Sequence, residues 1–398
     1  MERGKIVTMF SKRITLFRLL GFPIQVDLSW LFLILLLGWS LSRGLFPSWY
    51  EQLAAETYTW MAVLGTVGFV LSILLHELAH AVVARHYGLS IRSITLFIFG
   101  GVAEIEDEPP HAWAEFWVTA AGPAASLALA GGFYGLYMLS LQQIWPESVE
   151  GLCRYLGWLN GLLAVFNLIP AFPLDGGRML RALLWYWRGD LPWATRIAAH
   201  LGGGFGSLMI GLSLIQLFAY QNYVQAFWWF LLGIFMRNAS VAAYHRMRLR
   251  EILRGEPIRP FIRQHDDCLP SYLSLQQFFE QYVEKEPHNL YPIVDPHTQT
   301  LMGCVRVDDI HTLAPHEWPE NTLRAILKPC PPELTIDSES DALQAVTQMN
   351  RQQSSRLVVL DQDHRYIGTI AMPDFVRFLS RKMGVDEDED DEQKSPSL

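Results

Sequence analysis

The sequence predicts an α-helical polytopic membrane domain of about six transmembrane helices, with a small membrane-adjacent β-sheet, followed by a cytosolic α/β domain. The first reason is composition, since 51% of the 398 residues are hydrophobic and only 18% are charged, a low share for a soluble protein. The second is that uncharged stretches, each about long enough to cross a bilayer, recur up to Met236. The third is that short strand-like runs replace them from about Ile258 onward.

Charge and cysteine content narrow the possible functions. The net charge is −9, but seven negative charges lie in the run Asp386–Glu392, which predicts a solvated, disordered tail over 386–398. We find no basic patch with interleaved aromatic residues, so no nucleic-acid partner is predicted. The four cysteines are isolated and form no C-x-x-C pattern, which indicates neither a cysteine-based zinc site nor a disulfide framework.

The first two membrane spans are predicted at Gly21–Ser42, which is apolar apart from Asp27, and from about Thr57 to Ala84. Basic residues before the first span resemble the start of a signal peptide. No small-residue cleavage site follows the apolar part, so we expect an uncleaved first membrane helix.

The second span ends in the stretch LSILLHELAHAVVA, which contains the pattern H-E-x-x-H. His76 and His80 are four residues apart, so on a helix they share one face and can bind a single zinc ion. Glu77 follows the first histidine, where it can hold or deprotonate a water molecule that the metal activates. The alternative is a pair of helix histidines that cap a membrane span, with Glu77 facing the headgroups.

The next stretch, Ile91–Ile105, favours strands over helix because it is rich in Ile, Thr, Phe and Val and is broken at Gly100-Gly101. We expect a small sheet or hairpin beside the membrane. The alternative is a re-entrant or interfacial loop.

Four further spans are predicted. Phe116–Pro146 and Tyr155–Leu174 are the third and fourth. Ile197–Met236 is too long for one crossing, so we expect a turn at Gln221-Asn222-Tyr223 between a fifth and a sixth span. His200 lies in this last region, and we expect it to be satisfied by a neighbouring helix.

The distribution of basic residues predicts that both termini are cytoplasmic. With the N-terminus inside, the outer loops contain only Arg43 and Arg154. The inner loops contain Arg85, Arg92, Arg178, Arg181, Arg188, Arg246, Arg248 and Arg250.

A third zinc ligand is predicted at Asp175, because a catalytic zinc usually takes three protein ligands and leaves a position for water. This aspartate ends an apolar span in the segment NLIPAFPLDGG, Asn167–Gly177, after two prolines and before two glycines. The alternative is that Asp175 only caps the helix that starts near Arg178.

The soluble region contains an internal repeat. Leu290–Ile310 and Arg356–Phe378 each read as strand, turn, strand and then an aspartate at a helix start. Asp309 and Asp374 each lie six residues after a glycine, at equivalent positions.

The sequence resembles the site-2 protease family of intramembrane zinc metalloproteases over about Phe17–Tyr244. The motifs that carry the resemblance are His76–His80, Asn167–Gly177, GFPIQVDLSW at Gly21–Trp30 and LFIFGGVAEI at Leu96–Ile105. The repeat after Ile258 resembles a tandem CBS domain, with repeats at about 256–320 and 325–385. We therefore expect a protease domain over 1–250 and a CBS pair over 256–385.

The resemblance implies that His76, His80 and Asp175 bind one zinc ion, that Glu77 is the general base, and that Asn167 stabilises the oxyanion. One departure is Ser126, where the family often has asparagine. Serine can still donate a hydrogen bond. The implied reaction is hydrolysis of a peptide bond within the transmembrane segment of a membrane protein, modulated by the CBS pair. Anti-sigma factors and membrane-bound transcription regulators are the partners that the family implies, acting in the lipid bilayer.

Tandem CBS domains often bind adenine nucleotides, with the ribose held by an aspartate and by a hydroxyl side chain three residues before it. Asp309 and Asp374 are present, but the hydroxyl positions are Arg306 and Ala371. This departure predicts weak or absent adenosine binding, with any nucleotide affinity depending on a phosphate contact from Arg306. The pair could instead serve to form a homodimer or to dock the substrate.

Two other functions are compatible with parts of the pattern. One is a CBS-regulated transporter or channel, which would spread polar groups along a path through several spans. The other is an inactive metal-binding homologue. The polar groups here converge on two span ends with metal-ligand chemistry, which favours the protease.

Overall fold

The computed structural model describes residues 13–98, 100–105, 108–143, 145–263, 269–284, 290–295, 300–310, 313–352, 354–363 and 365–382, and the statements below concern these residues. The chain divides into two compact units, Met1–His245 and Arg246–Leu398, and each is described by itself. The acidic tail predicted over 386–398 lies outside the described residues.

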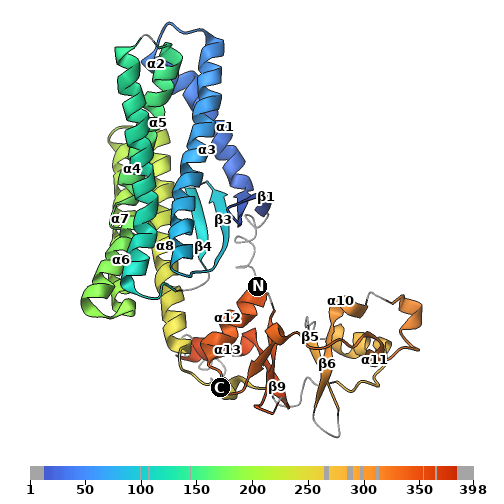
Figure 1. The fold of residues 1–398 in the computed structure, drawn as a ribbon. Coiled ribbons are helices and arrows are strands. Elements are labelled where there is room, and N and C mark those ends of the chain that lie inside the picture. Colours follow the sequence, from blue (N-terminus) through green and yellow to red (C-terminus); the bar gives the residue numbers. More distant parts are fainter. Residues whose placement is uncertain are drawn as a thin grey trace, which may run out of the picture. The chain divides into compact units, whose positions relative to one another are not determined.

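The first unit is a bundle of long helices with a small sheet at one side (Figure 1). Its helices are α1 (Leu28–Ser40), a π-helical turn (Leu41–Leu45), α2 (Phe46–Trp49), α3 (Ala55–His86), α4 (Ala112–Gln142), α5 (Glu147–Asn167), α6 (Asp175–Arg188), α7 (Leu191–Phe218) and α8 (Tyr223–Leu253). Its strands are β1 (Arg13–Leu19), β2 (Phe22–Asp27), β3 (Ile91–Phe97) and β4 (Gly100–Ile105).

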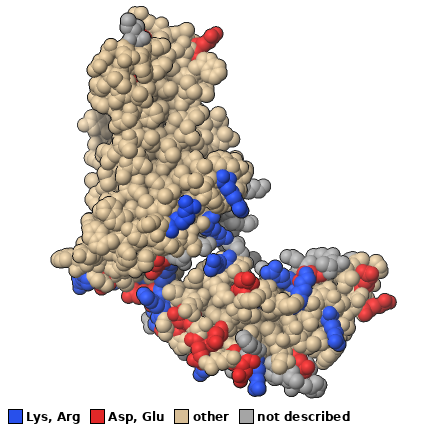
Figure 2. All heavy atoms as spheres, in the orientation of Figure 1, with Lys and Arg blue, Asp and Glu red and all other residues tan. Residues whose placement is uncertain are grey.

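Five helical segments in the described residues are long and apolar enough to cross a membrane, at 28–49, 55–86, 112–142, 191–218 and 223–253. Figure 2 shows that charged residues are scarce over most of the visible face of this unit and gather toward its lower end. The turn predicted between the last two spans is confirmed, because α7 ends at Phe218 and α8 begins at Tyr223.

The fourth predicted span, Tyr155–Leu174, differs from the structure. Helix α5 begins earlier, at Glu147, and ends at Asn167, so the last residues of the predicted span form the loop that leads into α6. The first turns of α5 carry Glu147, Glu150 and Arg154, and its remaining uncharged part is too short to cross a bilayer alone. Helix α5 is therefore not among the five helices that are long and apolar enough to cross a membrane.

The predicted hairpin at Ile91–Ile105 is confirmed and belongs to a larger sheet. The strand order is β1-β2-β3-β4, with β2 and β3 parallel and the other pairs antiparallel. Strand β2 takes up residues that the sequence suggested for the first span, which instead starts at Leu28. Asp27 caps that helix, since its Oδ1 accepts a hydrogen bond from Ser29 N at 2.9 Å.

Helices α7 and α8 come into backbone contact at two glycines. A Cβ at Gly206 would lie 2.7 Å from the carbonyl oxygen of Gly233, and a Cβ at Gly233 would lie 2.7 Å from that of Gly206. Any side chain at either position would push the helices apart, so both glycines fix a close crossing in the membrane unit.

The second unit is α/β. Its elements are α9 (Leu275–Phe278), a π-helical turn (Phe279–Val283), β5 (Leu290–Val294), β6 (Leu301–Arg306), α10 (Val307–Ile310), α11 (Leu323–Ile326), β7 (Thr335–Asp337), α12 (Ala342–Gln352), β8 (Arg356–Leu360), β9 (Tyr366–Ala371) and α13 (Met372–Lys382), with short 3-10 turns at 259–261, 315–317 and 332–334. Two hydrophobic cores fill the unit, one around Val358 and Ile370 and the other around Ile293 and Val305.

The internal repeat is visible in the pairing of strands. Hairpins β5–β6 and β8–β9 are both antiparallel. A further segment pairs with the second strand of each hairpin, through Lys328 opposite Cys304 and Arg263 opposite Thr369. Gly303 and Gly368 are equivalent, because in each case an added Cβ would collide with the carbonyl oxygen of that further segment.

One cysteine pair was not predicted. Cys304 and Cys330 are bonded to each other, with their Cα atoms 4.9 Å apart, and Cys153 is free and buried. The two partners are 26 residues apart and follow no local pattern, so only the fold brings them together.

Candidate metal centre and active site

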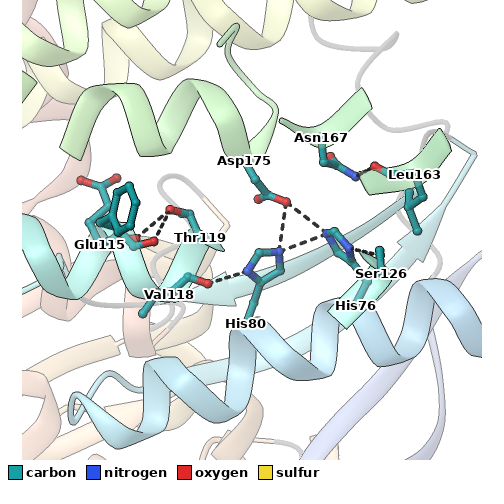
Figure 3. Close-up of polar contacts among 10 residues, drawn as sticks. His76, His80, Glu115, Val118, Thr119, Ser126, Leu163, Asn167 and Asp175 are labelled. Carbon is teal, nitrogen blue, oxygen red and sulfur yellow. Dashed lines mark hydrogen bonds and ion pairs between the residues drawn. The ribbon is translucent and has the colours of Figure 1, made fainter. Parts of the chain in front are cut away.

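Three side-chain atoms from two helices meet at one point (Figure 3). His76 and His80 both project from α3, and their Nε2 atoms are 3.2 Å apart. Asp175 is the first residue of α6, and its Oδ2 lies 3.1 Å from each of these nitrogens. The structure therefore brings together the three ligands that the sequence predicted.

The hydrogen bonds of the outer ring nitrogens determine what these three atoms can bind. His80 Nδ1 lies 2.7 Å from the carbonyl oxygen of Val118, which can only accept, so Nδ1 carries the proton and Nε2 presents a lone pair. His76 Nδ1 lies 2.9 Å from Ser126 Oγ, which can accept in the same way. Two lone pairs and a carboxylate oxygen then face one another without a donor between them, an arrangement that suits a cation.

The spacing also suits zinc. Ligands about 2.0–2.1 Å from a tetrahedral zinc ion are separated by about 3.3 Å, close to the edges of the triangle described above. All three side chains are largely buried, with exposed fractions of 4%, 7% and 13% for His76, His80 and Asp175.

Asp175 is held in position by the loop before α6. The glycines that follow it, Gly176 and Gly177, have no room for a Cβ, which would collide with the backbone of Leu168 and Ala171. The loop itself is tied to α8, because Ser240 Oγ donates to the carbonyl oxygen of Phe172 at 2.8 Å. The Asp-Gly-Gly sequence is thus explained by close packing of the helix start against its own loop.

Helix α4 supports the two histidines although it contributes no ligand. Ser126 and the carbonyl of Val118 contact their outer nitrogens, as described above. Between them lies Gly122, where an added Cβ would be 2.6 Å from His76 Nε2 and 2.5 Å from His80 Cε1. Only glycine leaves this face of α4 open to the imidazoles.

The same face of α4 also holds the helix of the third ligand. Glu115 is fully buried, accepts a hydrogen bond from Arg181 Nε at 2.8 Å, and lies 3.9 Å from Arg178 Nε. Both arginines are on α6, three and six residues after Asp175. Burial lowers the pKa of Arg178, but a guanidinium stays charged in proteins. Glu115 was not predicted as a site residue, because in the sequence it is simply an acidic residue at the start of an apolar stretch.

Glu77 is buried on α3 and is covered by strand β4. A Cβ at Gly101 would lie 2.5 Å from Glu77 Cγ and 2.9 Å from its Cδ. The strand therefore passes directly over the predicted base, and its outer edge is not paired with another strand among the described residues.

Asn167 is oriented differently from what the sequence suggested. It is the last residue of α5, and its Nδ2 donates to the carbonyl oxygen of Leu163 at 3.0 Å (Figure 3). The amide points along its own helix rather than to the three ligand atoms, so a contact with substrate would require a change of side-chain rotamer.

The two aspartates predicted to bind nucleotide, Asp309 and Asp374, have equivalent surroundings in the second unit. Asp374 accepts hydrogen bonds from Arg263, with Nη2 to Oδ1 at 2.7 Å and Nε to Oδ2 at 2.9 Å. Asp309 pairs with Lys328 and accepts from Arg306 N at 3.3 Å. Each aspartate thus already has a basic partner from the strand segment beside it.

Comparison with known proteins identifies the family. The model of peptidase family M50 matches residues 64–148 and 136–211, and the CBS domain model matches residues 323–381. The Mycobacterium tuberculosis protein Rip3 is 34% identical over 302 residues, which is 76% of each chain. The chain belongs to peptidase family M50. Zinc metalloprotease MJ0392 of Methanocaldococcus jannaschii is 30% identical to this M50 protein over 302 residues, or 75% of this chain and 79% of the relative.

A solved structure, the site-2 protease from Methanocaldococcus jannaschii, is 28% identical and covers 58% of this M50 protein and 95% of its own chain, with a TM-score of 0.41. Family membership confirms the resemblance to the site-2 proteases. The M50 protein is a multi-pass membrane zinc metalloprotease with a C-terminal CBS domain, which decides against the transporter or channel. The matched CBS region, 323–381, overlaps the second predicted repeat, about 325–385.

Proposed function

We propose that this protein is an intramembrane zinc endopeptidase that holds one zinc ion through His76, His80 and Asp175. The observation that carries the proposal is the convergence of three lone-pair atoms, 3.1–3.2 Å apart, with both histidines oriented by contacts from α4. The site lies at the end of α3, a helix long and apolar enough to cross the bilayer.

The chemistry is divided between the metal and the chain. Zinc, when bound, lowers the pKa of water to about 7 and polarises the scissile carbonyl. Glu77 accepts the proton of the attacking water and donates it to the amine that leaves when the C–N bond breaks. Asn167, after rotating away from Leu163, donates to the oxygen of the tetrahedral carbon, a contact worth about 10²–10³ in rate in comparable enzymes.

The substrate is the transmembrane segment of a membrane protein, with anti-sigma factors and membrane-bound transcription regulators as the classes that the family suggests. Helical peptide bonds are not accessible to attack, so the segment must unwind first. The free edge of β4 beside Glu77 supports binding of the unwound segment as an added strand through main-chain hydrogen bonds.

Glu77→Gln separates catalysis from metal binding. The variant should keep wild-type zinc content, because Glu77 is not a ligand, and should lose cleavage. Proteomic comparison of cells producing either form should reveal membrane-protein fragments that disappear with the variant. Full zinc content after His80→Ala plus Asp175→Ala would refute the ligand assignment, and unchanged fragments with Glu77→Gln would refute the assigned base.

The proposed organisation is a protease domain over 1–250 and a tandem CBS pair over 256–385, with both termini in the cytoplasm. The excess of arginine in the predicted inner loops supports this orientation. Reporter fusions after Glu51 and Glu147 should report the outer side. A cytoplasmic signal at either position would overturn the map.

For the CBS pair we propose weak or absent adenosine binding. The pairing of Asp374 with Arg263, and of Asp309 with Lys328, supports this view because a ribose hydroxyl would have to displace a cation from each carboxylate. A cavity of about 640 Å³ beside Asp374 is lined by Arg263, Arg377 and Arg381, which favours phosphate over sugar.

Calorimetry on the full-length protein with ATP, AMP and adenosine tests the CBS proposal. Affinity should rise with phosphate number. Tight adenosine binding that survives Arg306→Ala would contradict it. If no nucleotide binds, the remaining role of the pair is to form a homodimer or dock the substrate, which light scattering of the same protein would test.

A further inference from the structure

A groove lies between the last two membrane helices, α7 and α8. It has a volume of about 280 Å³ and is lined by α7 and α8 residues, namely Ala199, His200, Gly203, Gly204, Ser207, Arg237, Ser240, Val241 and Tyr244. Gly203 and Gly204 form an open floor, because a Cβ at either position would meet nothing within 4 Å.

Arg237 brings a charge into this groove from within a membrane helix. It follows fourteen uncharged residues of α8, which is about 21 Å of helix at 1.5 Å per residue. The hydrocarbon core is about 30 Å thick, so the Cα of Arg237 lies inside it or close to its boundary. A charge at that depth is costly unless it is neutralised.

No acidic side chain of the same helical pair can neutralise Arg237. The sequence from Leu191 to His245 contains neither aspartate nor glutamate. Among the described residues, the guanidinium makes no ion pair or hydrogen bond. The counter-charge must therefore come from outside the α7–α8 pair.

Two further polar side chains border the same groove. His200 Nδ1 donates to the carbonyl oxygen of Arg196 at 2.7 Å, which leaves Nε2 as the ring nitrogen without a backbone partner. The ring of His200 lies 6.2 Å from that of Tyr244 on α8. The groove thus combines a planar cation, an imidazole and a phenol beside a glycine floor that lets a bulky group approach the helix backbone.

From this arrangement we infer that the groove binds the phosphate headgroup of an anionic phospholipid. The guanidinium fork of Arg237 supplies paired hydrogen bonds and charge to the phosphate. Tyr244 and His200 contact the rest of the headgroup. The inference needs only that α7 and α8 are membrane helices, so it stands independently of the proposed proteolysis.

The groove adjoins the metal centre through one residue. Ser240 lines the groove and donates to the carbonyl of Phe172, in the loop that positions Asp175. Gly202, next to the glycine floor, packs against the same residue, with an added Cβ 2.7 Å from Phe172 N. A lipid in the groove therefore lies one side chain away from the loop of the third ligand.

Native mass spectrometry of the full-length protein tests the inference. The detergent-solubilised protein is titrated with short-chain phosphatidylglycerol or with phosphatidylcholine of the same chain length. Wild-type protein should retain one phosphatidylglycerol in preference to phosphatidylcholine. Arg237→Gln should weaken this retention by about tenfold or more, since hydrogen bonds to charged groups are the strong ones. The matched control is Arg248→Gln, which removes a cation from the same helix outside the groove and should retain lipid like wild type.

Three outcomes would overturn the inference. If wild-type protein retained both lipids equally, the net charge of the headgroup would not determine binding. If Arg237→Gln retained phosphatidylglycerol as well as wild type does, the lipid would not bind at Arg237. Displacement of the lipid by millimolar inorganic phosphate would show a site for the free anion. If Arg237→Gln fails to fold, His200→Gln and Tyr244→Phe provide the same comparison, and unchanged retention in both would count against the groove.

Discussion

Gly122→Ala should weaken zinc binding about a hundredfold while leaving α4 intact. The added Cβ would lie 2.6 Å from His76 Nε2 and 2.5 Å from His80 Cε1, where ordinary contacts are at least about 3.4 Å. The imidazoles would have to move by almost 1 Å, and metal-ligand distances tolerate only about 0.2 Å. At least one ligand is therefore lost.

The expected size of the effect follows from the number of ligands. Zinc binding in structural sites contributes about 10–16 kcal/mol, so one ligand of four is worth roughly 3 kcal/mol, or about a hundredfold in Kd. The assay is zinc content by mass spectrometry, together with competition against a chromophoric chelator. Gly132→Ala is the matched control, because a Cβ at that position of the same helix meets nothing within 4 Å.

The control should bind zinc as wild type does and be slightly more stable, since alanine favours helix over glycine by about 1 kcal/mol. Wild-type zinc affinity in Gly122→Ala would refute the reasoning. It would mean that the imidazoles reach the metal from another direction than the one the structure shows.

Three other predictions concern the surroundings of the metal. Ser126→Ala removes the contact to His76 Nδ1 and should weaken zinc binding by about 10–100-fold in the same competition assay, while unchanged affinity would exclude a supporting role. Glu115→Ala leaves the partly buried guanidinium groups of Arg178 and Arg181 without their carboxylate and should lower the free energy of unfolding by about 1.5–3 kcal/mol in denaturant titrations, with Glu115→Gln less severe. Gly101→Ala should displace Glu77 and reduce cleavage with zinc content preserved, and full activity would show that β4 can move away.

The three candidate metal ligands could be predicted because their chemistry is local in sequence. His76 and His80 are one helical turn apart, and Asp175 stands out as an acid between an apolar span and two glycines. Glu115 could not be found in this way. Its partners are more than sixty residues away on α6, and a buried carboxylate that pairs with arginine looks in sequence like any acid at a helix start.

The boundaries of the spans were predicted less well than their existence. Hydropathy alone cannot separate β2 from the helix that Asp27 caps, because both are apolar. Strand β2 is also fixed by pairing with β3, which lies more than sixty residues away in the sequence. For helix α5 the error was in the other direction. Its charged first turns were left out of the predicted span, although they belong to the same helix as its apolar end. The Cys304–Cys330 bond depends on a strand pairing that no local pattern encodes.

Helix α4 supplies no ligand, yet one of its faces touches the outer nitrogen of each histidine and the arginines that follow the carboxylate. A small slide or tilt of this single helix would disturb all three ligands together. Loss of metal should therefore be all-or-none, without a long-lived two-coordinate state. Stopped-flow chelation should then follow a single exponential, and substitutions along this face should change the rate of zinc release in parallel.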